Sequence, residues 1–195
     1  MLELPESQFI LEMLKRELSP DLYYHSIDHT MDVYNTTKVF AKKESISKAD
    51  TKLLMIAALY HDSGYLHQRE DHESISCNIV RATLPGFDYT ESDIETICGI
   101  IMATKLPQQP HSILEQIICD ADLDYLGRDD FFEIGSRLFR ELQAAKLIAN
   151  EADWDILQID FLQKHRYFTQ TAQHLRNDKK QVHLNQLLSN NRTRK

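Results

Sequence analysis

Apolar residues recur every three or four positions along almost the whole chain, a spacing typical of helices that bury one face. The first such stretch, which includes Phe9, Ile10 and Leu14, ends at Ser19-Pro20. No segment stands out for the strict alternation of apolar and polar residues that a half-buried strand requires. The pattern therefore predicts an all-α bundle of about eight helices.

Capping residues and breakers divide the rest of the chain into further helices. Ser47 and Ser112 stand where caps are needed, Thr90 to Asp93 resembles a capping box, and Gly64 and Gly127 follow helix ends. The expected helices cover residues 26–43, 48–60, 71–84, 90–104, 112–126, 129–148, 151–167 and 169–188. Residues 53–59 are apolar on nearly every side, so their helix should be central.

Composition favours one domain with a continuous core. The chain has 195 residues, 42% of them hydrophobic, with only 5 Gly and 5 Pro. We expect a single domain over residues 1–188, with its core in 23–127, C-terminal helices in 129–188 and a polar tail in 189–195. The apolar C-terminal helices could support a homodimer.

Charge and cysteine usage exclude some classes of function. The net charge is −8 and no basic stripe precedes the short tail 191–195, which argues against stable nucleic-acid binding. No segment approaches the roughly 20 apolar residues that a membrane span needs, and residues 1–6 lack a basic leader. Cys77, Cys98 and Cys119 lack Cys-x-x-Cys spacing and lie among apolar residues. These features predict a cytoplasmic protein.

Four polar residues that lie within or at the end of apolar helices carry the candidate chemistry: His29, the pair His61-Asp62, and Asp122. Two imidazoles and two carboxylates are a ligand set suited to a divalent metal of borderline hardness. Burial of two carboxylates without a cation would be costly or would force their protonation. The sequence therefore predicts a buried metal site.

The order of these residues resembles that of the HD-domain superfamily of metal-dependent phosphohydrolases. The resemblance rests on Leu59 to Tyr65, His72 to Ser76 and Ile118 to Gly127, and it covers roughly residues 23–127. It implies an HD-type helical domain with His29, His61, Asp62 and Asp122 as the metal ligands. Asp120 matches a second acidic position of the motif and could support or replace Asp122. Side chains two apart on a helix point in different directions, so we prefer Asp122.

A second resemblance concerns the segment from Tyr24 to Val33, which is similar to the signature of cyclic-nucleotide phosphodiesterases. In that signature the earlier histidine donates a proton, and here this residue is His25. Histidine is a residue type that can protonate an alkoxide leaving group near neutral pH. The structural alternative is that His25 only caps the second helix.

Other candidates have weaker support. Glu73 could accept a hydrogen bond from a metal-bound water or a ligand histidine, or it could be an acidic residue favoured in a first helical turn. Lys105, at a junction between helix and loop, could bind phosphate, as could Arg69; either could instead be solvated. His165 has packing or capping as its default role.

The resemblance implies hydrolysis of a phosphoester, on a monoester or a diester of a nucleotide or other small molecule. A bound cation would acidify water and polarise the phosphoryl group, Asp62 would orient the water, and Lys105 would offset charge. Mixed nitrogen and oxygen ligation favours manganese, iron, cobalt, nickel or zinc over magnesium.

We expect one metal ion. Relatives with two ions add further histidines, whereas the three available here, His67, His72 and His111, lack a convincing buried helical setting. Two alternatives stay open. One is a di-iron oxygenase, which would need at least two of those histidines as ligands. The other is a non-catalytic, metal-stabilised module that binds a nucleotide or a protein.

Overall fold

The computed structural model describes residues 1–193, with side chains described to residue 191. This part of the chain folds into nine α-helices and three short 3-10 helices and contains no strand. The α-helices are α1 (Pro5–Glu17), α2 (Ile27–Lys43), α3 (Lys48–Tyr60), α4 (His72–Thr83), α5 (Glu91–Met102), α6 (Ile113–Asp122), α7 (Phe131–Ala144), α8 (Glu151–Lys164) and α9 (Gln170–Thr193). The 3-10 helices are η1 (Ser63–Leu66), η2 (Leu84–Phe87) and η3 (Asp124–Gly127). The predicted all-α bundle is confirmed.

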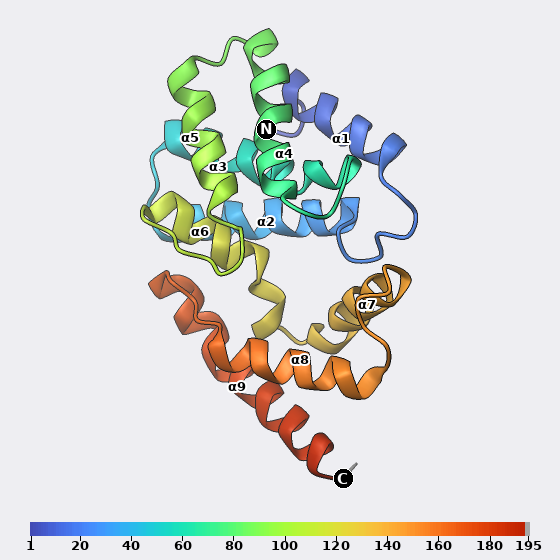
Figure 1. The fold of residues 1–195 in the computed structure, drawn as a ribbon. Coiled ribbons are helices and arrows are strands. Elements are labelled where there is room, and N and C mark those ends of the chain that lie inside the picture. Colours follow the sequence, from blue (N-terminus) through green and yellow to red (C-terminus); the bar gives the residue numbers. More distant parts are fainter. Residues whose placement is uncertain (194–195) are drawn as a thin grey trace.

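Helices α1 to α6 form one body of the molecule, and α7 to α9 lie against one end of it (Figure 1). Within the body α3 packs against α2, α5 and α1, and α6 packs against α2. Residues 54–60 of α3 are all buried, as their apolar character predicts. Helix α9 packs along η3 and α8, so it ties the C-terminal helices to the end of α6.

The predicted caps set the starts of three helices. The hydroxyl of Ser47 accepts a hydrogen bond from the backbone N–H of Asp50, and Ser112 does the same for Glu115. Thr90 opens α5 with a complete capping box. Such caps satisfy backbone donors that the first turn of a helix leaves free.

Several helix ends differ from the predicted ones, among them that of α7, which stops at Ala144 and not at residue 148. Helix α6 stops at Asp122, not at residue 126, and the chain tightens into η3, on which α9 packs. Helix α8 stops at Lys164, and α9 continues to Thr193 through most of the expected polar tail. Residues 194–195 of that tail lie outside the described residues. Among the helices of residues 1–193, none is both long and apolar enough to span a bilayer.

Candidate metal centre and adjoining cavity

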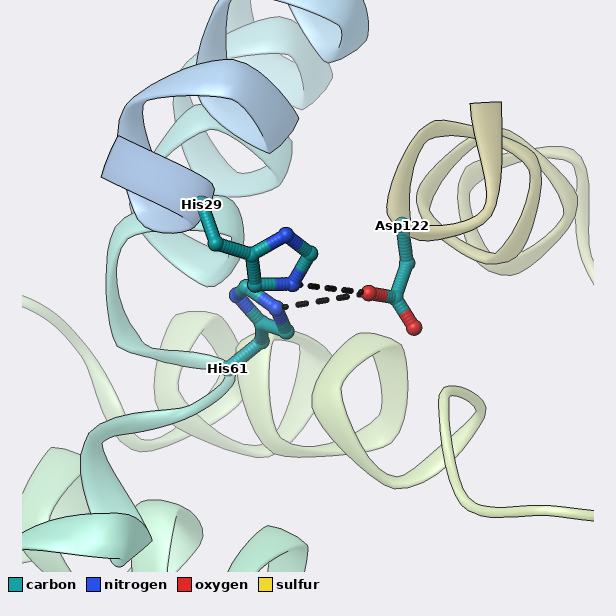
Figure 2. Close-up of side chains that lie close together, drawn as sticks. All are labelled: His29, His61 and Asp122. Carbon is teal, nitrogen blue, oxygen red and sulfur yellow. Dashed lines mark hydrogen bonds and ion pairs between the residues drawn. The ribbon is translucent and has the colours of Figure 1, made fainter. Parts of the chain in front are cut away.

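Four side chains that are far apart in sequence meet between α2, α3 and α6. We call His29, His61, Asp62 and Asp122 the His/Asp cluster. His29 begins the inner face of α2, His61 and Asp62 follow the end of α3, and Asp122 ends α6. Figure 2 shows both imidazoles turned toward one carboxylate oxygen of Asp122, with the Nε2 atoms of His29 and His61 at 3.1 and 3.7 Å from Oδ1. Oδ2 of Asp62 lies 3.4 and 3.2 Å from the same two nitrogens.

Backbone contacts set the orientation of His61. Its Nδ1–H donates to the carbonyl oxygen of Ala58 at 2.9 Å, so Nε2 faces the cluster. Metal-binding histidines commonly use such a carbonyl to fix the tautomer and orientation of the ring. Ser76 on α4 adds a clamp, because its hydroxyl donates to the carbonyl of His61 and accepts from the N–H of Gly64.

The protein alone leaves polar atoms of the cluster without partners. Nε2 of His61 and Oδ2 of Asp62 are buried and have no hydrogen bond. Burial alone would lower the pKa of His29, but the carboxylates of Asp122 and Asp62 raise it to about 9. Burial would likewise raise the pKa of Asp122, but the hydrogen bond from His29 and the charge of the nearby His61 imidazole lower it to about 2.

These observations fit a cation site. One donor atom each from His29, His61 and Asp122 lies within 4.8 Å of the others. A divalent cation among these donors would balance the carboxylates and leave both imidazoles neutral, with their Nε2 lone pairs in use. Nitrogen and oxygen donors together suit the metals of the first transition row.

His72, for which the sequence offers no convincing buried helical setting, is half-buried and lies beside the cluster. It is the first residue of α4, and its Nε2 lies 3.4 Å from Oδ1 of Asp62 and 3.5 Å from Oε1 of Glu73. Its Nδ1–H donates to the carbonyl of Arg69, so this ring is held as the ring of His61 is. Glu73 is buried, which sets it apart from a solvated acid of a first turn.

Gly64 explains how α4 comes so close. A Cβ at Gly64 would lie 2.0 Å from the carbonyl oxygen of His72, so only glycine allows these backbones to touch. The spacing of Gly64 and His72 in the sequence does not reveal this contact. As a result His72 lies beside Asp62, and Glu73 lies beside His72.

Asp120 has a different role from Asp122. Its two carboxylate oxygens accept hydrogen bonds from the backbone N–H groups of Phe168 and Thr169 and from the hydroxyl of Thr169. Burial raises its pKa to about 6, with those hydrogen bonds acting in the opposite direction. Asp120 therefore anchors the segment that enters α9, and Asp122 is the carboxylate beside the imidazoles.

A second arrangement surrounds His25, just before α2. Oε1 of Glu141 on α7 lies 2.6 Å from His25 Nδ1 and accepts from Arg69, and Oε2 accepts from the backbone N–H groups of Tyr24 and His25. The ring of Tyr65 stacks on His25, with its hydroxyl 3.1 Å from Nε2. We call His25, Tyr65, Arg69 and Glu141 the His25 network.

Sequence reasoning missed Glu141. It shares one face of α7 with Ile134 and Leu138, which pack against the core, and it is only 1% exposed. A carboxylate on an apolar helical stripe is the signal that could have pointed to a buried partner. Burial would raise the pKa of Glu141, but the hydrogen bonds with His25 lower it to about 2.

Comparison with known proteins places this geometry in a family. The model of the HD domain matches residues 26–124, half of the chain, and this span contains every residue of the His/Asp cluster. The chain belongs to the HD-domain family. Metal-dependent hydrolysis of phosphoesters is typical of that family.

A solved structure agrees with this assignment. The crystal structure of a predicted HD superfamily hydrolase from an uncultured Thermotogales bacterium has a TM-score of 0.66 and 21% sequence identity to this chain. The match covers 97% of this chain and 93% of the other. At this identity the likeness shows a shared fold. No curated protein matches this HD-domain chain.

The remaining candidate residues of this HD domain are exposed or paired with other side chains. Lys105 is exposed and pairs with Asp71, and Arg69 is tied to Glu141. His67 and His111 are exposed, so neither provides the second additional ligand that a di-iron site would need. Nδ1 of His165 lies 3.1 Å from the ammonium of Lys180, which supports a packing role.

A cavity of about 470 Å³ joins the two arrangements. Its polar side includes His25, Asp62, His72, Glu73 and Asp122, with Arg69 and Lys105 also in the lining. Its other side comes from the C-terminal helices and is apolar. This volume lies within the roughly 300–1,000 Å³ that is usual for small-molecule sites.

Proposed function

We propose that this protein is a metal-dependent phosphohydrolase that cleaves a phosphoester of a small molecule. The observation that carries the proposal is the His/Asp cluster, whose buried His61 Nε2 and Asp62 Oδ2 make no hydrogen bond within the protein. The cluster opens on a cavity that also holds a positioned histidine, His25. This combination favours catalysis over a closed structural metal site.

The cluster would hold one divalent cation through His29, His61, Asp62 and Asp122. When bound, the cation would supply positive charge that acidifies water and polarises a phosphoryl oxygen. Oδ1 of Asp62 and the carboxylate of Glu73 would accept hydrogen bonds from the attacking water and orient it. The cation's identity, and the expectation of one ion, stay predictions.

His25 would protonate the leaving group. Glu141 lies 2.6 Å from Nδ1, so when the ring is protonated at both nitrogens Nε2 would be the atom that carries a proton into the cavity. As the water oxygen bonds to phosphorus, the bond from phosphorus to the leaving oxygen would break, the Nε2 proton of protonated His25 would pass to that oxygen, and the protons of the water would leave with the phosphate product. Arg69 and Lys105 would offset charge on the phosphoryl group from the cavity wall.

Metal content and hydrolysis measured together test the proposal. We expect about one metal ion per chain in purified protein, and hydrolysis of an aryl phosphate with added manganese or nickel. Asp122→Ala should lose both the metal and at least 100-fold of the activity. Asp178→Ala, which removes an exposed aspartate on α9, is the matched control and should change neither. A wild-type protein that retains metal yet hydrolyses no phosphoester would contradict the proposal and favour a binding module.

Leaving-group dependence tests the role of His25. Replacement by Ala should slow hydrolysis of an alkyl phosphate far more than that of p-nitrophenyl phosphate, because nitrophenolate leaves without a proton. We expect a difference of about 100-fold between the two losses, within the range for general acids. Equal losses for both esters would assign His25 a structural role.

A further inference from the structure

The two sides of the cavity differ sharply in chemistry. The polar side gathers the His/Asp cluster, the His25 network and two basic side chains. The opposite side is formed by α7 and α8 and presents aromatic and aliphatic side chains. They include Phe131, Leu138, Leu142, Trp154, Leu157 and Phe161.

From this division we infer that the natural substrate is an amphiphilic phosphomonoester, with a phosphate on an alkyl or aromatic group, not a free nucleotide. The inference rests on the proposed function for the phosphate end and on the cavity alone for the apolar end. Phosphate beside the cluster would place its organic group against α7 and α8.

The apolar side offers few partners for a nucleoside. Among the lining residues of α7 and α8 in the described chain, only the amide of Gln158 and the indole N–H of Trp154 can hydrogen-bond. A ribose and a base carry many polar groups, and each would lose water without gaining a partner. An alkyl or aryl group has no such cost and gains from leaving water.

The exposure of the lining supports an occupant from solution. Leu157 and Leu106 line the cavity yet are 46% and 57% exposed, so part of this apolar surface meets solvent. A ligand that covers it removes apolar area from water, at about 0.8 kcal/mol for each buried CH₂, or roughly fourfold in affinity.

Trp154 provides a direct readout, because it is the only tryptophan of the chain and it lines the apolar side. We would titrate the wild-type protein with n-butyl, n-hexyl and n-octyl phosphate and follow its fluorescence, with calorimetry on the same series as a second readout. Each added pair of carbons should tighten binding by up to about 15-fold. Adenosine monophosphate should bind more weakly than octyl phosphate.

Two adjacent residues of α8 form a matched pair. Leu157 lines the cavity, whereas Ile156 is 58% exposed and does not. Leu157→Asn should weaken binding of octyl phosphate by at least fivefold and leave butyl phosphate nearly unchanged; Ile156→Asn should change neither. Leu157→Ala is the milder alternative if the Asn variant does not fold, and it should shift octyl phosphate in the same direction.

The outcomes separate this inference from the proposed function. Dissociation constants within twofold of each other across the alkyl series, or tighter binding of adenosine monophosphate, would overturn the inference even if phosphoesters are hydrolysed. Binding that tightens with chain length in a protein that hydrolyses nothing would overturn the proposed function and reduce the inference to a binding site for an amphiphilic phosphate. Asp122→Asn should retain the chain-length dependence while losing hydrolysis.

Discussion

Two histidine arrangements face the same cavity, and they differ in how completely the protein satisfies them. In the His25 network both oxygens of Glu141 accept hydrogen bonds from buried or half-buried donors. In the His/Asp cluster, His61 and Asp62 each retain a buried polar atom without a partner. The network is therefore assembled by the chain itself, whereas the cluster keeps donor atoms that could bind a cation.

Removal of the carboxylate at Glu141 should have the largest effect on stability. Glu141→Ala leaves the side chain of Arg69, the ring of His25 and two backbone donors without their acceptor. We expect a loss of about 3–5 kcal/mol in the free energy of unfolding, measured with urea. Glu133→Ala, at an exposed position of α7, should cost no more than about 0.5 kcal/mol. Equal losses for the two variants would show that the network is not a stabilising unit.

Chelation should affect the cluster and spare the network. Metal present at about 1,000 times its dissociation constant stabilises a fold by about 4 kcal/mol, so chelation should lower Tm by roughly 10 °C. Thermal unfolding with and without chelator measures this difference. Asp122→Ala should not respond to chelator, whereas Glu141→Gln should respond as fully as the wild type. An unchanged wild-type Tm, with metal loss verified, would mean that the cluster needs no cation.

Acid should weaken the network through Glu141. Its pKa falls from an ordinary 4.5 to about 2 in the folded protein, so its stabilising contribution is complete above pH 4.5 and disappears as the pH falls toward 2. The difference in unfolding free energy between wild type and Glu141→Gln should shrink by on the order of 2–3 kcal/mol over that range. Urea denaturation at several pH values measures it. A difference that stays constant would contradict an ionised Glu141.

The clamp behind His61 should give the smallest effect. Ser76→Ala removes a hydroxyl that bridges the carbonyl of His61 and the N–H of Gly64, and should cost about 1–2 kcal/mol. It should also weaken metal binding by about tenfold, because supporting groups of this kind orient a ligand ring. Ser74→Ala, on the exposed side of α4, is the control. Metal titration and urea denaturation of both variants would show whether the clamp acts on the cluster.

The sequence indicated the residues of the His/Asp cluster but not the neighbouring Glu141 and His72. His29, His61 and Asp122 each lie on or next to a helix whose apolar face must be buried, so periodicity alone brings them inward. Glu141 escaped notice because its partner, His25, is 116 residues away and no local pattern marks the pair. The position of His72 was also missed, because it depends on backbone contact at Gly64.

The helix boundaries also divide into those set by local residues and those set by distant contacts. Capping residues such as Ser47, Thr90 and Ser112 act within one turn, so the starts of α3, α5 and α6 were predictable from sequence. The end of α6 depends on α9, which packs on η3 from some 50 residues further along the chain. Apolar periodicity continues through residue 126 and could not reveal that stop.

The hydrogen bonds of Asp120 have a consequence for the order in which the chain is completed during synthesis. All four ligand candidates have been synthesised once residue 122 is made, but the donors for Asp120 follow only at residues 168 and 169. A nascent chain, or a fragment cut after η3, would have a carboxylate beside the cluster with none of its native partners. Asp120, within the segment that matches the HD family, thus gains these partners only after residue 169 has been synthesised.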